Sequence, residues 1–313
     1  MKIVYMGTPD YAVPTLEALI KDGHTVEAVF CQPDKPVGRK KIMTPPAVKV
    51  YALSQGLKVY QPDTLKSDDV YELIKNISPD VIVVVAYGKI LPERILNIAP
   101  LGCINGHGSI LPKYRGAAPI QWAIINGETE TGVTAMFMDK GIDTGDILKI
   151  SKTKIGENET AEELFNRLSV ITAELLSETL KEVEQGKITP VKQDEEEATY
   201  APIINKEMAL IDFSKSAYEI FNAVRGFNSW PVAYCMYEGK RLKVFSCKIN
   251  GTSDLPYGTV ANSERLAVVC GDGKCIDLKE IQLEGSKRMT AQEFLMGKKI
   301  PVGTVLIGGE QRG

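Results

Sequence analysis

Short β-rich runs alternate with helical patterns through residues 1–190, and this alternation limits the fold more than any other feature of the chain. The β-rich runs cover residues 2–6, 26–30, 58–60, 81–86, 103–105 and 132–138. Strands that alternate with helices form βαβ units, which predict a mainly parallel sheet. Residues 81–85 are continuously apolar, as expected of a central strand that is buried on both faces. We therefore expect a Rossmann-like α/β domain.

Two local signals mark the last helix of this domain. Thr160 and Glu163 have the spacing of a capping box, in which each side chain accepts a hydrogen bond from the backbone N–H of the other residue. They predict the start of a long amphipathic helix, and Gly186 predicts its end.

The pattern changes after residue 206. A helix predicted around 217–224 is followed by closely spaced strand-like runs with Gly, Asn, Asp and Pro turns between them. The runs cover residues 233–237, 242–247, 258–260, 266–270 and 275–283. A small OB-like β-barrel is the fold that we expect here. The predicted organisation is a catalytic domain over 1–188, a linker over 189–206 that contains four consecutive acids, and a barrel over 207–313.

Composition excludes several classes of protein. The longest apolar run covers only residues 81–87, whereas a membrane-spanning helix needs ~20 residues. Residues 1–7 lack a signal-peptide cleavage pattern and are predicted to be the first strand. The six cysteines are scattered and have neither the pattern of a disulfide framework nor the spacing of a zinc site. We expect a cytoplasmic monomer that binds no metal.

The near-neutral net charge of −3 conceals an asymmetry. Residues 1–205 hold 22 basic and 28 acidic side chains, whereas residues 206–313 hold 15 and 12. A basic barrel that follows an acidic domain favours a surface for nucleic acid or another polyanion. A barrel face that is merely solvated is the alternative.

The chain has only two histidines, which simplifies the search for a group that titrates near neutral pH. His24 lies in a turn and is expected to be exposed. His107 stands where a strand runs into a loop rich in Gly and Pro, and open α/β sheets bind their ligands at the carboxyl ends of strands. The strand period of two puts Cys103, Asn105 and His107 on one face. Asn105 and His107 would project together into this crevice.

A second loop, residues 138–146, supplies candidate carboxylates. A carboxylate that accepts the imidazole N–H fixes the tautomer and stabilises the imidazolium. Asp143 lies between Gly141 and Gly145 in the tightest part of the loop, which favours it for this role. Asp139 and Asp146 are the alternatives, or are ordinary turn acids.

An amide, an imidazole and a carboxylate with no hydroxyl nucleophile suit direct transfer of an acyl group to an amine. Asn105 would donate to the oxyanion of a tetrahedral intermediate, and His107 would accept the proton that the amine loses. Asp143 would orient His107 and balance its charge. A metal site built from His107 and the aspartates, and a thiolate nucleophile at Cys103, are the alternatives.

The loop around His107 resembles the signature of the folate-dependent formyltransferases. The resemblance rests on Asn105-Gly-His107-Gly-Ser109-Ile-Leu-Pro112, on Arg115-Gly116 and on Asp143 within Gly-Ile-Asp-Thr-Gly. Residues 6–10, 32–39, 79–80, 84–89, 225–228 and 230–231 extend it over nearly the whole chain. The chain departs from the family in having Gly106 and Gly108 where Val and Ala are more usual, and we expect these glycines to loosen the loop.

The resemblance implies a donor, an acceptor and a set of site residues. The donor would be 10-formyltetrahydrofolate, and the acceptor would be the α-amino group of initiator methionyl-tRNA, because the resemblance is closest to members that modify tRNA. Asn105, His107 and Asp143 would be catalytic. The residues implied in folate binding are Ala86, Tyr87, Gly88, Lys89, Ile90, Leu91, Ser109, Ile110, Leu111 and Pro112. A formyltransferase that acts on an amino sugar is the alternative within the family.

Residues 34–49 form a long βα connection with five basic residues and one acid. An exposed basic loop beside a transfer site fits contact with an RNA backbone, and a solvated surface loop is the alternative. The resemblance implies that this loop enters the acceptor end of tRNA. The residues implied in tRNA binding are Lys35, Arg39, Lys40 and Lys41.

Overall fold

The computed structural model describes residues 1–38 and 40–309, which form two compact units. The first unit comprises residues 1–119, 130–154 and 165–201. The second comprises residues 120–129 and 155–164 and the chain from Pro202 onward. The domain boundaries expected at 188 and 207 stay a prediction about which segments fold independently.

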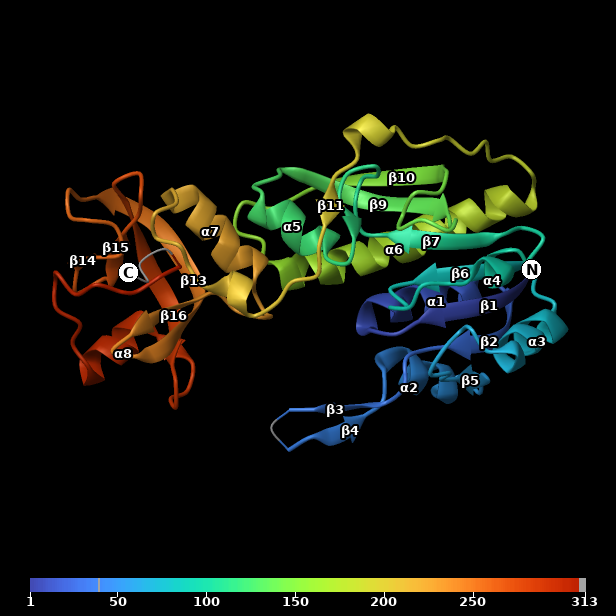
Figure 1. The fold of residues 1–313 in the computed structure, drawn as a ribbon, viewed down its shortest axis with the longest axis horizontal. Coiled ribbons are helices and arrows are strands. Elements are labelled where there is room, and N and C mark those ends of the chain that lie inside the picture. Colours follow the sequence, from blue (N-terminus) through green and yellow to red (C-terminus); the bar gives the residue numbers. More distant parts are fainter. Residues whose placement is uncertain (39, 310–313) are drawn as a thin grey trace. The chain divides into compact units, whose positions relative to one another are not determined.

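The first unit is built on a sheet in the order β10-β9-β7-β6-β1-β2-β5 (Figure 1). Its strands are β1 (Lys2–Gly7), β2 (Thr25–Phe30), β5 (Val59–Tyr60), β6 (Val81–Val85), β7 (Cys103–His107), β9 (Glu130–Phe137) and β10 (Ile147–Lys154). β1, β2, β5, β6 and β7 are parallel, whereas β9 pairs antiparallel with β7 and β10 pairs antiparallel with β9. Every residue of β6 is buried. The predicted Rossmann-like, mainly parallel sheet is confirmed.

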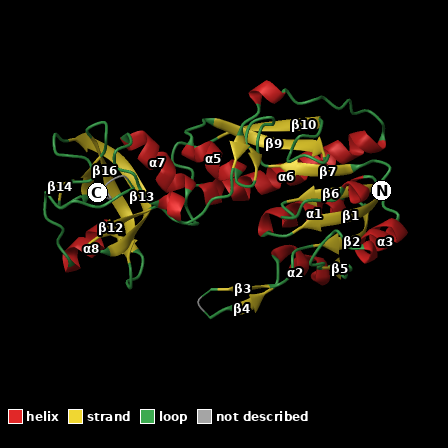
Figure 2. Cartoon of the chain, in the orientation of Figure 1, coloured by secondary structure: helices red, strands yellow, loops and turns green. Residues whose placement is uncertain are grey.

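Helices flank the strands of this sheet (Figure 2). They are α1 (Val13–Lys21), α2 (Ala47–Ser54), α3 (Asp68–Ile77), α4 (Glu93–Leu96) and α6 (Ala161–Glu184), whereas α5 (Pro119–Ile125) belongs almost entirely to the second unit. The predicted capping box at the start of α6 is present: the Thr160 N–H donates to Glu163 Oε2 at 2.9 Å, and the Glu163 N–H donates to Thr160 Oγ1 at 3.3 Å. Among the described helices, none is long and apolar enough to cross a membrane.

The second unit contains an antiparallel sheet in the order β12-β13-β16-β15-β14, with β17 beside β16. Its elements are α7 (Ala217–Gly226), β12 (Tyr234–Tyr237), β13 (Lys240–Thr252), β14 (Val260–Asn262), β15 (Ala267–Val269), β16 (Lys274–Leu283), β17 (Met289–Thr290) and α8 (Ala291–Gly297). Near the end of the chain, Ile307 bridges to Met236 of β12 and Val305 bridges to Thr259 beside β14. Both edges of the sheet are therefore joined, which closes it into the predicted small barrel.

Two short pairs of strands complete the fold. β3 (Lys35–Val37) and β4 (Ile42–Thr44) form an antiparallel hairpin within the long basic connection. Figure 1 shows this hairpin extending away from β2 and α2. β8 (Arg115–Gly116) pairs in parallel with β11 (Tyr200–Ala201), so the end of the predicted linker is hydrogen bonded to the loop that follows β7.

Helix α6 occupies the space that Gly106 leaves on β7. A Cβ atom at position 106 would lie 2.6 Å from Thr172 Cγ2 and 3.0 Å from Leu176 Cδ1, both on α6. The Thr172 hydroxyl lies 2.7 Å from the Tyr11 hydroxyl, which holds the threonine in place. Gly106 is therefore in tight contact with the helix, and the expectation that the glycines at 106 and 108 loosen the loop stays a prediction.

This packing predicts a compensating pair of substitutions. Gly106→Ala should lower the free energy of unfolding by roughly 1–3 kcal/mol, because the new methyl group overpacks the contact with Thr172. Adding Thr172→Ser removes Cγ2 but keeps the hydroxyl, and should recover part of the loss. Chemical denaturation measures both changes. Gly297→Ala, which adds a methyl group in open space, is the control. A Gly106→Ala protein as stable as the parent would contradict the packing.

Candidate active site

The carboxyl ends of β6 and β7 lie side by side at one edge of the first-unit sheet. The two strands are parallel, with Ile82 opposite Cys103 and Val84 opposite Asn105. Because parallel strands end at the same edge, the segments that follow Val85 and His107 start next to each other. The sheet therefore brings two sequence-predicted segments, 86–91 and 108–112, to one place.

Asn105 and His107 stand on the same face of β7, with 9% and 6% of their surfaces exposed. Within residues 1–38 and 40–309, no group hydrogen bonds to the Asn105 carboxamide. Its N–H donors are therefore free to bind an oxygen atom of a ligand. A preorganised donor of this kind stabilises charge that develops on a carbonyl oxygen.

The His107 ring lies between two acceptors. Nε2 is 2.9 Å from the Tyr114 carbonyl oxygen, and Nδ1 is 3.5 Å from Asp143 Oδ2. Since a carbonyl can only accept, Nε2 carries the proton and Nδ1 is the basic atom of the neutral ring. A proton taken up at Nδ1 would face the Asp143 carboxylate, which stabilises the imidazolium. The Tyr114 carbonyl orients the ring, a role that the sequence assigned to Asp143.

Both of these acceptors belong to strained loops that contact each other. Tyr114 and Asp143 have φ values of +60° and +54°, in the left-handed region that few non-glycine residues adopt. Asp143 Oδ2 accepts a hydrogen bond of 2.9 Å from the Gly116 N–H. The carboxylate that faces His107 is thus held by the loop that also supplies the carbonyl.

Sequence reasoning missed the residues that hold these loops. Arg115 is fully buried and binds Gln193 and Glu195, in the segment that was expected to be an exposed linker. Gln193 also donates to the backbone of the Asp143 loop. No pattern links positions so far apart in the chain. The only available signal was the arginine itself, since a charged side chain among small residues needs a partner when it is buried.

The contacts and burial of the other candidate residues at this site argue against a catalytic or metal-binding role. Asp139 Oδ1 accepts from the Gly141 N–H at 2.9 Å and from the Thr144 hydroxyl at 2.6 Å, as expected of a turn acid. Burial raises the pKa of the Cys103 thiol to about 12, which disfavours a thiolate nucleophile. In the part of the chain that the structure describes, no group of three His, Cys, Asp or Glu side chains is arranged to hold a metal ion.

The segment after β6 is folded as a tight turn. Ala86 and Gly88 have φ values of +46° and +81°, and Tyr87 is buried with its carbonyl accepting from Thr8 Oγ1 at 2.8 Å and Gln32 Nε2 at 3.1 Å. Lys89 Nζ donates to backbone carbonyls, one of them that of Asp63 at 2.9 Å. Ile90 is 78% exposed, whereas Leu91 is buried in the core. Hence these six residues do not all face one pocket.

Hydrogen bonds to other parts of the protein hold the segment that follows β7. Ser109 Oγ donates to the Lys113 carbonyl at 2.6 Å, and the Leu111 N–H donates to Thr134 Oγ1 at 3.1 Å. Leu111 is buried, whereas Ile110 and Pro112 are partly exposed. Ile110 and Pro112 are therefore the members of this segment with surface left for a ligand.

The β3–β4 hairpin presents its basic residues to solvent. Lys35, Lys40 and Lys41 are exposed, and Val37 and Ile42 expose 55% and 62% of their surfaces. The prediction for Arg39 lies outside the described residues. Exposed cations of this kind suit a surface that contacts phosphates.

An ion pair holds the base of this hairpin. Lys49 Nζ lies 2.8 and 2.9 Å from the two Asp34 oxygens, and Gln61 Nε2 donates to Asp34 Oδ1 at 2.7 Å. These hydrogen bonds, the one from Gln61 first and those from Lys49 next, lower the pKa of Asp34 below its usual range. Lys49 is therefore neutralised and does not add to the free charge of the hairpin.

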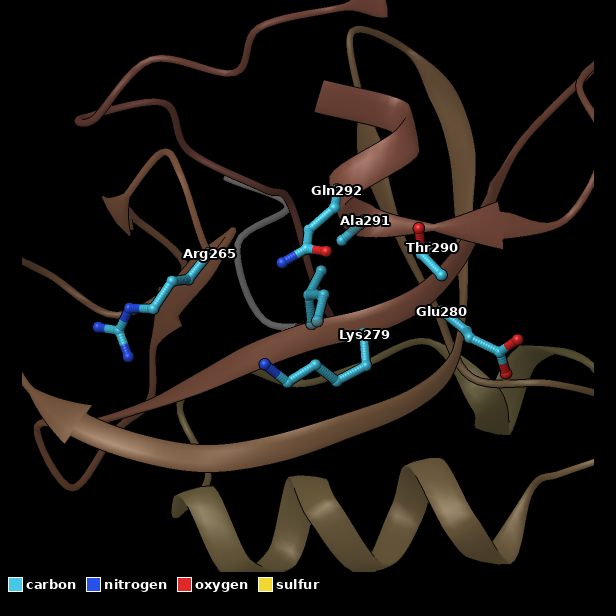
Figure 3. Close-up of a pocket in the computed structure, with 7 residues that line it drawn as sticks. Arg265, Lys279, Glu280, Thr290, Ala291 and Gln292 are labelled. Atoms are coloured by element: carbon cyan, nitrogen blue, oxygen red, sulfur yellow. The ribbon is translucent and has the colours of Figure 1, made fainter. Parts of the chain in front are cut away.

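A pocket in the second unit also has cationic side chains. It is lined by Arg265, Leu278, Lys279, Glu280, Thr290, Ala291 and Gln292 (Figure 3). Arg265 and Lys279 both approach the fully buried Asp277 carboxylate, at 3.4 and 3.2 Å. Glu280 pairs with Arg288. The charges around this pocket are thus balanced, and it is not a strong site for an anion.

The fold and the site define a transferase that belongs to a known family. Residues 1–180 match the formyl transferase family, and residues 203–299 match the formyl transferase C-terminal domain. The chain therefore belongs to the formyl transferase family. This confirms the family that the sequence motifs indicated.

Curated relatives cover the full length of the chain. The methionyl-tRNA formyltransferase of Caldanaerobacter subterraneus is 50% identical over 309 residues, which cover 98% of this chain and 100% of the relative. That of Acetivibrio thermocellus is 45% identical over 310 residues, covering 98% and 99%. Identity and coverage at this level place the chain among the methionyl-tRNA formyltransferases of the family.

Solved structures support the fold. An N-formyltransferase from Helicobacter canadensis, solved with folinic acid and dTDP-3-aminofucose, is 21% identical, with a TM-score of 0.65 over 92% of this chain and 100% of that chain. HypX from Aquifex aeolicus in complex with tetrahydrofolic acid has a TM-score of 0.63 at 17% identity, over 97% and 50%. The shared fold spans both units.

The ion pair at the hairpin base predicts a change in susceptibility to protease. Asp34→Ala should speed tryptic cleavage after Lys40 and Lys41 by a factor of about two to five, because a partly exposed ion pair contributes up to about 1 kcal/mol. Mass spectrometry of a digestion time course measures the rates. Asp63→Ala, which removes an exposed carboxylate nearby, is the control. Equal rates in the two variants would show that the pair does not restrain the hairpin.

Proposed function

We propose that the protein transfers the formyl group of 10-formyltetrahydrofolate to the α-amino group of initiator methionyl-tRNA. The observation that supports this best is the pairing on β7 of a free carboxamide, Asn105, with an imidazole, His107, whose basic nitrogen faces a carboxylate. Membership of the methionyl-tRNA formyltransferases supports the choice of donor and acceptor.

The proposed reaction is a direct attack. The amine nitrogen forms a bond to the formyl carbon, and Asn105 donates to the oxyanion of the tetrahedral intermediate. His107 takes the proton of the attacking amine at Nδ1, and Asp143 stabilises the imidazolium. When the intermediate collapses, the bond between the carbon and N10 of the folate breaks, and the same proton passes to N10. Atoms and charges balance without a covalent enzyme intermediate.

The folate is proposed to bind where the loops after β6 and β7 meet. In the segment 86–91, Ala86, Gly88 and the exposed Ile90 have backbone or side-chain surface to offer. The Tyr87 carbonyl and the Lys89 ammonium are already engaged within the protein, and they would support the turn from behind. After β7, Ile110 and Pro112 would contact the ligand, while Ser109 and Leu111 hold the loop in shape.

The tRNA is proposed to approach over the β3–β4 hairpin. Lys35, Lys40 and Lys41 are exposed there and would contact phosphates, together with Arg39. Each such contact adds to the salt dependence of binding. The barrel of the second unit is proposed to provide further tRNA contacts, as its excess of basic residues suggests.

The reaction is tested by incubating the protein with 10-formyltetrahydrofolate and methionyl initiator tRNA and measuring N-formylmethionine. His107→Ala and Asn105→Ala should each lower kcat on the order of 10²-fold or more. His24→Ala removes the other histidine and should have no effect. A dTDP-amino sugar offered in place of the tRNA tests the alternative acceptor. Near-normal turnover by both site variants would exclude the mechanism.

The role of the hairpin is tested separately. Arg39→Ala, and the double variant Lys40→Ala/Lys41→Ala, should raise KM for tRNA and weaken its dependence on salt, with KM for the folate unchanged. Steady-state kinetics at several salt concentrations measures both. Lys187→Ala, which removes an exposed cation from the turn after α6, is the matched control. An unchanged KM for tRNA in the hairpin variants would remove this surface from the proposal.

A further inference from the structure

We propose that residues 191–201 form a strap that positions the two groups facing His107, and that Gln193 is its main positioning residue. This inference rests on the proposed function, because it concerns the geometry that the reaction requires. The segment follows α6 and contains the run of acids 194–197, whose side chains are mostly exposed. The other contacts of the segment are with the loops that flank His107.

Gln193 joins the two loops that flank His107. Its Nε2 donates to the Asp143 and Gly145 carbonyls, both at 2.8 Å. Its Oε1 accepts from Arg115 Nε at 3.1 Å and from Arg115 Nη2 at 2.8 Å. Both hydrogens and both lone pairs of the amide are therefore used. The hydrogen bond from the Gly116 N–H to Asp143 Oδ2 also links these loops.

Arg115 is held in place from the strap side. Its guanidinium donates to both oxygens of Glu195, through Nη1 and Nη2, each at 2.8 Å. Planar bidentate pairs of this type have well-defined geometry. Glu195 raises the pKa of Arg115, and the same pair lowers the pKa of Glu195. The buried arginine thus keeps its charge and presents Nε and Nη2 to Gln193.

The strap also fixes the backbone of the loop that orients the ring. The Tyr114 N–H donates to Thr199 Oγ1 and the Arg115 N–H donates to the Thr199 carbonyl, each at 2.8 Å. The Tyr114 carbonyl, which accepts from His107, belongs to the same peptide unit as the Arg115 N–H. At the other end of the strap, Val191 and Ile147 exchange backbone hydrogen bonds of 2.8 and 2.9 Å. The strap therefore anchors both the carbonyl side and the carboxylate side of the imidazole.

A substitution at position 193 separates positioning from simple stability. Gln193→Glu keeps the size of the side chain and an acceptor for Arg115, but places an oxygen against the Asp143 and Gly145 carbonyls. The Asp143 loop should move away from the strap while the Arg115 contacts persist. Gln185→Glu makes the same chemical change at an exposed position and is the matched control.

Two measurements on the full-length protein test the proposal. Gln193→Glu should lower kcat by about tenfold or more, with KM for both substrates within about twofold, because a small misplacement of catalytic groups costs rate. NMR of the histidine rings reports the site directly, since the chain has only two histidines and His24→Gln assigns their signals. The His107 signal and its titration midpoint should change, whereas those of His24 should not.

The two measurements together show whether Gln193 positions the groups around His107. A fall in kcat together with a changed His107 titration supports the strap, provided that Gln185→Glu changes neither. A kcat within twofold of the parent, or an unchanged His107 titration, overturns the proposal. If Gln193→Glu does not fold, Gln193→Asn, which is shorter by one methylene group, is judged by the same criteria. If the parent protein transfers no formyl group, the proposed function fails, and the NMR result still decides whether Gln193 positions the groups around His107.

Discussion

The hydrogen bond between His107 Nε2 and the Tyr114 carbonyl is the interaction on which the rest of the site depends. It fixes the tautomer, because a carbonyl can only accept a hydrogen bond, so Nε2 carries the proton. Nδ1 then becomes the basic atom, and Asp143 is the carboxylate that balances it. Asn105, two residues earlier on the same strand, supplies a free amide donor. One strand and two loops thus bring together the groups that an acyl transfer to an amine requires.

This arrangement has a conformational cost that the surrounding structure offsets. Tyr114 and Asp143 both adopt left-handed backbone conformations, which cost about 1–3 kcal/mol each in residues other than glycine. Hydrogen bonds with Gln193 and Thr199, and the ion pair of the buried Arg115 with the exposed Glu195, hold these conformations. Helix α6 packs against the opposite face of β7 at Gly106, so the strand that bears Asn105 and His107 is restrained on both sides.

The ion pairs that individual side chains form, more than the net charge of a whole segment of the chain, decide where a polyanion can bind. Residues 206–313 hold more basic than acidic side chains, yet Arg265 and Lys279 at the pocket face the buried Asp277. Residues 1–205 are acidic overall, yet the hairpin exposes Lys35, Lys40 and Lys41, while Lys49 at its base is paired with Asp34. The sequence located the basic residues of the connection 34–49 but did not show that Lys49 is paired with Asp34.

The sequence by itself determined the features that depend on neighbouring residues. Alternating apolar runs gave the strands, the Thr160–Glu163 pair gave the start of α6, and the period of two placed Asn105 and His107 on one face. Only the tertiary structure decided which aspartate faces His107, that the Tyr114 carbonyl orients it, and that Gln193 supports both. It also showed Thr172 filling the space at Gly106. These contacts join residues far apart in the chain, and their partners are set by how the strands and loops pack, which no local pattern encodes.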